Sequence, residues 1–154
     1  MGLDQYLKKR VQLNKDGKSR IYKDEELYYW RKNYAIDDWF HDKVWDGMSE
    51  DNCVDMLVDP IVLIELRDIL KKIISQKDLK KSLKVAQDLL PADDYTQESE
   101  CITISHGKIV TKKRKINLFK ACYLPDFKHT YEKLNEIIND KDFYDTYFYY
   151  HIWY

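Results

Sequence analysis

The chain has 154 residues, with 26 Lys and Arg against 27 Asp and Glu, and 22 aromatic residues of which 13 are Tyr. This length fits one domain, residues 1–154, with a core of its own. With 44% hydrophobic residues and a net charge of −1, the composition excludes a disordered polyampholyte and a membrane protein. The charge balance also argues against a strongly basic nucleic-acid binder.

Charge is distributed unevenly along the chain. Residues 1–23 carry 7 basic and 2 acidic side chains, whereas residues 24–59 carry 3 basic and 11 acidic ones. One interpretation is that the two blocks lie against each other in the fold, where opposite charges pair across neighbouring elements. Composition alone leaves this interpretation open.

Both ends of the sequence predict extended structure. Leu3, Gln5 and Leu7 alternate with the period of a strand, and Asp16-Gly17 is a hairpin signal that returns the chain through residues 20–22. The last stretch, residues 143–154, is rich in Tyr, Phe, Ile and Trp, which fit a pleated surface, so it predicts a closing strand.

Three or four helices are expected between these strands. Residues 25–45 predict a first helix, because their apolar positions fall within an arc of about 90° at roughly 100° per residue. The residues of this arc are Tyr29, Asn33, Ile36, Phe40 and Val44. A second helix is expected to start with Asp59 as N-cap and Pro60 at its first position. A third covers residues 79–90, and Asp126 is expected to cap a fourth.

A short hairpin is expected in the polar region that follows the third helix. Residues 101–105 predict a strand, and His106-Gly107 predicts a turn into residues 108–110. The sum is an α+β fold, in which three to four helices pack on a small antiparallel sheet formed by both termini and the 101–111 region.

The aromatic and basic segment of residues 28–45 is the best candidate for a binding site. A buried amide at Asn33 needs a hydrogen-bond partner, which is either a neighbouring backbone group or a ligand. A guanidinium beside aromatic rings, as at Arg31, suits a phosphate, but it also pairs with local carboxylates such as Asp4 or Asp38. The candidate ligand- or partner-binding residues are Tyr29, Trp30, Arg31, Lys32, Asn33, Tyr34 and Trp45.

No metal or cofactor site is expected. Asp38 and Asp42 are one helical turn apart and lie near Asp37 and His41, but no further ligands follow at a telling spacing. A solvated acidic face is therefore the preferred interpretation. The sequence contains no zinc-ligand spacing, no nucleophile elbow and no glycine-rich phosphate loop, so an enzyme is the secondary hypothesis.

Two further clusters each have two interpretations. Residues 112–115 are basic and are followed by Phe119 and Tyr123, the pattern of single-strand nucleic-acid contacts. Basic runs are commonly just solvated, so we do not expect a nucleic-acid partner. The aromatic residues 147–154 predict either a strand covered on both faces or a recognition surface, for which a homodimer is the simplest case.

The sequence predicts a cytosolic location without membrane insertion. Cys53, Cys101 and Cys122 are an odd, widely spaced set, which does not suggest a disulfide framework. Basic residues rather than an apolar region follow the N-terminus, and the apolar run at residues 61–64 is far too short for a bilayer.

Several short motifs together resemble a family of small proteins encoded by tailed bacteriophages. They are Met1-Gly2-Leu3-Asp4 with Tyr6-Leu7, Tyr29-Trp30-Arg31-Lys32 with Asn33, then Ile36, Trp39-Phe40, Leu89-Leu90-Pro91, residues 126–138, and Tyr149-Tyr150 with Trp153. The chain departs from the family pattern at Asp37, where the family has His, and in residues 101–123, which look expanded. The resemblance implies a phage context and an accessory gene product.

The resulting expectation is a non-enzymatic phage accessory protein that acts by binding in the host cell cytoplasm. By analogy with other accessory products, it would antagonise host defence, either as an anti-CRISPR-like inhibitor of a host protein or as a sponge for a small nucleotide signal. In the nucleotide version, Trp30 or Tyr29 stacks a base, Arg31 and Lys32 take phosphate, and Asn33 reads a base edge. The alternatives are a metal-dependent enzyme that acts on a nucleotide or nucleic acid, and a structural homo-oligomer.

Overall fold

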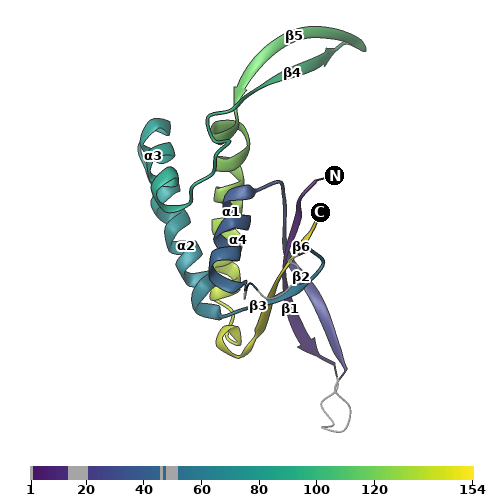
Figure 1. Cartoon of the computed structure of the whole chain (residues 1–154), viewed down its shortest axis with the longest axis vertical. Helices are drawn as coiled ribbons and strands as arrows, with labels where there is room; N and C mark the ends of the chain where they lie inside the picture. The colour runs from purple at the N-terminus through teal and green to yellow at the C-terminus, as the bar shows by residue number, and fades with distance from the viewer. Residues whose placement is uncertain (1, 14–20, 46, 48–51) are drawn as a thin grey trace.

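A four-stranded antiparallel sheet with helices on one side forms the body of the protein (Figure 1). The computed structural model describes residues 2–13, 21–45, 47 and 52–154. The predicted α+β class and the contribution of both chain ends to the sheet are confirmed. The expected turn at Asp16-Gly17 lies outside the described residues.

The sheet has the strand order β2-β1-β6-β3, and every neighbouring pair is antiparallel. Its strands are β1 (Asp4–Gln12), β2 (Tyr22–Arg31), β3 (Asp55–Val58) and β6 (Tyr147–Trp153). The α-helices are α1 (Tyr34–Val44), α2 (Pro60–Ile74), α3 (Leu79–Leu89) and α4 (Leu124–Ile138). A π-helical turn, η1 (Phe119–Tyr123), runs into α4, and a 3-10 turn, η2 (Phe143–Asp145), precedes β6.

The prediction of a single helix over residues 25–45 is wrong. Residues 22–31 form β2, and helix α1 begins at Tyr34. The helix starts there because the Asn33 side chain accepts a hydrogen bond from the Ile36 backbone N–H at 3.1 Å, which makes Asn33 the N-cap. Tyr29 matched the helical spacing only by coincidence, since it lies on a strand.

The other helices agree closely with the sequence prediction, with one correction. Asp59 caps α2 by accepting from the Ile61 N–H at 2.9 Å, and α3 ends beside Pro91 as expected. Asp126 does not cap α4; it lies within the first turn, because η1 continues directly into the helix and supplies its preceding turn.

The 101–111 region forms a hairpin apart from the main sheet. Strands β4 (Glu98–Ser105) and β5 (Lys108–Asn117) pair only with each other. Figure 1 shows this hairpin projecting beyond the helices and the sheet. The predicted strands and the His106-Gly107 turn are present, but the sheet takes its fourth strand from β3, which the sequence analysis missed.

The basic and acidic blocks lie against each other, as one interpretation of the sequence held. In the β1–β2 register, Lys8, Lys9 and Arg10 stand opposite Glu26, Glu25 and Asp24, respectively. The Arg10 Nε donates to Asp24 Oδ1 at 2.8 Å. Such partly exposed ion pairs contribute about 1 kcal/mol or less each to stability. We therefore infer that their main effect is to favour the observed register of β1 against β2.

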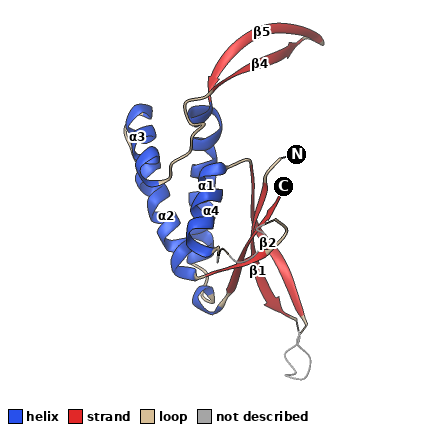
Figure 2. Cartoon of the chain, viewed as in Figure 1, coloured by secondary structure: helices blue, strands red, loops and turns tan. Residues whose placement is uncertain are grey.

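The two faces of the sheet differ. Figure 2 shows the helices gathered on one side of the sheet, and alternate strand residues on that side, such as Leu7, Phe148 and Tyr150, are buried. We call the opposite side the open face. It carries the cross-strand rows Arg31, Asp4 and Trp153; Tyr29, Tyr6, His151 and Asp55; Glu26, Lys8, Tyr149 and Leu57; and Asp24, Arg10 and Tyr147.

A buried glutamine connects the sheet to the start of α1. Gln5 is fully buried, and its Nε2 donates to the Asn33 carbonyl at 3.0 Å and to the Tyr150 hydroxyl at 2.9 Å. Its Oε1 accepts from the Asn33 backbone N–H at 2.9 Å. The amide therefore replaces the ladder bonds that the chain loses where β2 ends and turns into α1.

We expect the Gln5→Leu substitution to lower the free energy of unfolding by about 2–3 kcal/mol, because it leaves the Asn33 N–H buried without a partner and removes one of the two donors to the Asn33 carbonyl. Urea unfolding followed by circular dichroism measures the change. Gln87→Leu, at an exposed position on α3, is the matched control and should change stability by less than about 0.5 kcal/mol. Equal effects of the two variants would contradict this role for Gln5.

Candidate functional site

The predicted binding residues divide between two structural elements. Tyr29, Trp30 and Arg31 end strand β2, whereas Tyr34 opens helix α1. Lys32 and Asn33 form the link between these two elements, which we call the β2–α1 junction. The candidate residues therefore do not form one aromatic helical face.

Trp30 is buried and cannot present a ring face to a ligand. Its side chain is 1% exposed, and its indole N–H donates to the Thr130 hydroxyl of α4 at 2.8 Å. The ring packs against Tyr28, Phe40 and Tyr150. The expectation that Trp30 stacks a base is wrong, because alternation along β2 turns it into the core.

Asn33 is buried by the protein's own atoms. Besides capping α1, its Nδ2 donates a short hydrogen bond to the Asp126 carboxylate of α4. Of the two interpretations of a buried amide, the partner within the fold applies. This bond fixes the position of the β2–α1 junction relative to the first turn of α4.

A pocket of about 390 Å³ opens between the β2–α1 junction and the start of α4. We call it the junction pocket. Its lining residues are Tyr29, Trp30, Arg31, Lys32, Asn33, Cys122, Tyr123, Pro125, Asp126 and His129. Five of the seven predicted binding residues thus lie around one hollow. Ligand pockets commonly enclose about 300–1,000 Å³, so this one suits a small molecule.

Two cations at the junction pocket lack a close carboxylate within the described residues. The Arg31 side chain is 68% exposed, and its one ion pair with a described residue, Asp4, spans 4.0 Å. Asp4 already accepts a 2.6 Å hydrogen bond from the Tyr29 hydroxyl. Lys32 forms no ion pair in the described part of the chain. These two side chains are therefore available to bind an anion.

The backbone places Lys32 at the pocket by an uncommon conformation. Its φ of 54° is in the left-handed region, which costs a residue with a side chain roughly 1–2 kcal/mol. The Lys32 N–H donates to the Leu3 carbonyl at 2.8 Å, and this bond holds the turn in place. Gly2 lies close to the Lys32 side chain. A Cβ added at Gly2 would lie 3.2 Å from the Lys32 Cε, which is a tight contact.

The carboxyl group of Asp126, which is partly buried, also lines the junction pocket. Burial raises the pKa of Asp126 above its ordinary value of 3.8, and the Asn33 amide and His129 oppose the shift. A carboxylate that accepts one bond from Asn33 retains lone pairs for other N–H donors in the pocket. The pocket thus combines cations at its mouth with an acceptor at its wall.

Two of the predicted binding residues, Tyr34 and Trp45, do not line this pocket. Both are partly exposed at opposite ends of α1, and neither lines the junction pocket. The pocket residues that the sequence analysis missed lie in η1 and α4, chiefly Cys122, Tyr123 and His129. No local motif marks them, because they meet the junction only through the tertiary fold.

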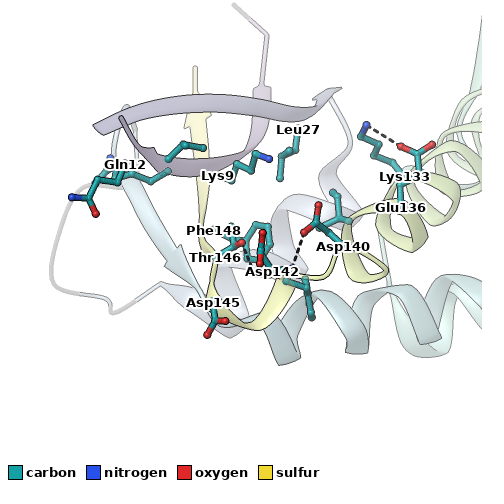
Figure 3. A pocket seen from close by; sticks show the side chains of 14 residues that line it. Lys9, Gln12, Leu27, Lys133, Glu136, Asp140, Asp142, Asp145, Thr146 and Phe148 are labelled. Atoms are coloured by element: carbon teal, nitrogen blue, oxygen red, sulfur yellow. Dashed lines mark hydrogen bonds and ion pairs between the residues drawn. The ribbon is translucent and has the colours of Figure 1, made fainter. Parts of the chain in front are cut away.

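A second hollow, of about 450 Å³, lies at the opposite end of α4 (Figure 3). Lys9 and Leu27 line it from the sheet, and Asp140 and Asp142 line it from the turn after α4. Its charged groups are engaged locally: Lys133 pairs with Glu136 at 3.1 Å, and Asp140 accepts from the Asp142 N–H at 2.8 Å. We therefore favour the junction pocket as the functional site.

Within the acidic cluster on α1, Asp37 has partners inside the protein. The Asp37 carboxylate is buried and accepts from the Tyr150 hydroxyl at 2.6 Å, with His41 Nδ1 at 3.4 Å. Burial raises the pKa of Asp38. Across residues 2–13, 21–45, 47 and 52–154, no group of three or more His, Cys, Asp and Glu side chains is arranged to hold a metal ion.

Comparisons with protein-family models, curated proteins and solved structures found no match to this chain. Within the described residues, no helix combines the length and apolar character needed to cross a bilayer.

The raised pKa of Asp126 predicts a pH-dependent stability difference. The folded state binds its proton more tightly than the unfolded state, so the ionised carboxylate lowers stability as the pH rises from 3.8 through the raised pKa. We expect Asp126→Asn, which keeps an acceptor for Asn33, to gain stability relative to the unmodified chain across this window and to hold a constant gain above it.

Urea unfolding at a series of pH values measures this difference. Asp88→Asn removes an equivalent charge from an exposed position on α3 and serves as the control. A difference between Asp126→Asn and the unmodified chain that stays flat with pH would show that burial does not disfavour the charged form.

Proposed function

We propose that this chain is a non-enzymatic binding protein whose junction pocket takes a small phosphorylated ligand of the nucleotide class. The observation that carries the proposal is the pair of cations at the pocket mouth. Arg31 and Lys32 are adjacent, accessible and without a close carboxylate among the described residues. A planar guanidinium can bind phosphate through two parallel hydrogen bonds, and the Lys32 ammonium adds a second charge.

The remaining walls favour a nucleotide over a bare phosphate. Tyr29 is 41% exposed, and its ring lies beside Arg31 with its hydroxyl held by Asp4. It replaces Trp30 as the ring on which a base would stack, a contact typically worth about 1–3 kcal/mol. Asp126 supplies an acceptor for the N–H groups of a base edge, the role that the sequence analysis gave to Asn33.

The resemblance to small tailed-bacteriophage proteins gives this binding a biological setting. A phage accessory protein that sequesters a nucleotide in the host cytoplasm would act as a sponge for a host immune signal. In this proposal, binding is stoichiometric and uses the cations of Arg31 and Lys32, the ring of Tyr29 and the carboxyl group of Asp126.

We expect Arg31→Ala to weaken nucleotide binding by about 10- to 100-fold, because a charge-assisted hydrogen bond to phosphate contributes roughly 1.5–3 kcal/mol. Isothermal titration calorimetry with inorganic phosphate, mononucleotides and cyclic dinucleotides measures the change. Lys80→Ala, which removes one exposed positive charge on α3, is the matched control and should bind as the unmodified chain does.

Two results would count against the proposal. One is the absence of binding across this panel by the unmodified chain. The other is an equal loss of affinity in Arg31→Ala and Lys80→Ala, which would mean that net charge rather than the pocket attracts the ligand.

A second candidate function is inhibition of a partner protein through the open face of the sheet. This face exposes several large apolar side chains, namely Tyr22, Tyr29, Leu57, Tyr147 and Trp153. Its charged groups neutralise one another, since Lys8 and Arg10 pair with Asp24 and Asp55. Aromatic, electrically balanced surfaces suit protein partners, including a second copy of the chain.

A Trp153→Ser and Tyr147→Ser double variant separates these two functions. Loss of a captured host protein, or of a dimer in sedimentation equilibrium, with unchanged nucleotide binding would assign the open face to a protein partner. Unchanged assembly and capture in this variant would remove the open face from consideration.

A further inference from the structure

The β4–β5 hairpin, which we call the arm, differs in charge from the rest of the protein. Residues 98–117 include five Lys and Arg and two Glu, a net charge of +3 on a chain whose net charge is −1. The remaining residues therefore carry −4. From residue 101 to residue 125 the sequence contains six basic residues and no acidic one.

The arm is anchored at its base by a buried aromatic cluster. Tyr95, Phe119 and Phe127 are fully buried and in contact through their ring edges. The Phe119 N–H donates to the Tyr95 carbonyl at 2.9 Å, and the Leu118 N–H donates to the Gln97 carbonyl at 3.1 Å. The two strands thus leave the body from a fixed base rather than from a loose loop.

The geometry of the arm is that of an extended, curved ribbon (Figure 1). The turn residues His106 and Gly107 both have positive φ, 52° and 73°, which matches the tight hairpin turn that preserves strand twist. The register shifts between Cys101 and Thr103, where two extra residues on β5 form a bulge. Bulges increase twist and curvature in a ribbon.

We propose that the arm binds double-stranded DNA by lying along a groove, with the basic residues in the β5 sequence supplying the positive charge that the phosphate backbone attracts. A two-stranded ribbon fits the major groove of B-form DNA. The ten residues of β5 span about 34 Å at roughly 3.4 Å per residue, close to one turn of the duplex.

The arm fits a duplex better than a single strand. Single-strand binding relies on aromatic rings that stack on bases, and residues 98–117 contain no Phe, Tyr or Trp. The rings that followed the basic run in the sequence, Phe119 and Tyr123, are buried in the base of the arm. A-form RNA is also disfavoured, because its major groove is too deep and narrow for a ribbon to read.

Two exposed isoleucines near the tip of the arm are also consistent with DNA binding. Ile104 and Ile109 stand directly opposite each other and are 74% and 75% exposed. Apolar side chains at the ends of DNA-binding elements contact the thymine methyl group or insert between base steps. Their exposure on an otherwise basic ribbon follows if they are covered when DNA is bound.

Fluorescence anisotropy with a labelled duplex of about 20 base pairs, roughly two turns, tests the proposal in the full-length protein. The arm variant replaces Lys112, Lys113, Arg114 and Lys115 with Gln. The matched body variant replaces Lys71, Lys72, Lys80 and Lys81 with Gln, which removes the same charge from α2 and α3. Titrations between about 50 and 200 mM salt give the salt dependence of each affinity.

We expect the arm variant to lose at least about tenfold in affinity at low salt and to show a clearly shallower salt dependence, since each phosphate contact contributes about 0.9 to the slope. The body variant should bind within about twofold of the unmodified chain. Both variants should keep the unmodified melting temperature to within a few degrees, because each change replaces one long polar side chain with another.

Three outcomes would overturn the proposal: equal losses in the two variants, tighter binding to the single strand or to duplex RNA of the same sequence, or no duplex binding by the unmodified chain at about 50 mM salt. Arg31→Ala separates this proposal from the nucleotide pocket. It should leave duplex binding unchanged, so that either function can fail without the other.

Discussion

The hydrogen bonds of one buried amide, Gln5, determine where the functional surface forms. The amide binds both backbone groups of Asn33 and the hydroxyl of Tyr150, which in turn donates to Asp37 in α1. The chain can therefore leave the sheet and begin α1 at one place only, and every buried side-chain polar atom in the described residues has a partner. Arg31 and Lys32 directly precede this fixed point, which places both residues at the junction pocket.

The electrostatic organisation separates two kinds of surface. On the open face of the sheet, cations and carboxylates pair across strands, as Arg10 does with Asp24. At the junction pocket and on the arm, basic residues outnumber nearby acids. An excess of positive charge attracts anions of any kind, whereas shape and aromatic content decide which anion binds. The junction pocket, which Tyr29 lines, suits a small nucleotide, and the arm without aromatic rings suits a duplex.

The elements predicted correctly from the sequence are those that a local pattern marks, such as a helix cap or a strand period. Asp59-Pro60 marks α2 because the cap and the first helical residue both fit, and the strand period that buries Phe148 and Tyr150 covers Tyr147–Trp153. The predicted closing strand began too early, because Phe143–Asp145 form a 3-10 turn. Strand β2 was mistaken for helix because it is an edge strand with a mostly exposed charged start, so it lacks apolar alternation. Arg31, Lys32 and Tyr29 were predicted from chemistry alone, but their meeting with Asp126 and His129 depends on tertiary contacts some 90 residues away in sequence, which no local pattern encodes.

The most direct test of the central claim is a nitrogen-15 NMR titration of the full-length protein with the tightest-binding nucleotide from the calorimetric panel. The claim that the β2–α1 junction and the start of α4 form one ligand site predicts amide shift changes concentrated in residues 29–33 and 122–129, with the amides of residues 98–115 unmoved. Changes confined to the arm or to strands β1, β3 and β6, or none at about 1 mM nucleotide, the weak limit of specific binding, would contradict it.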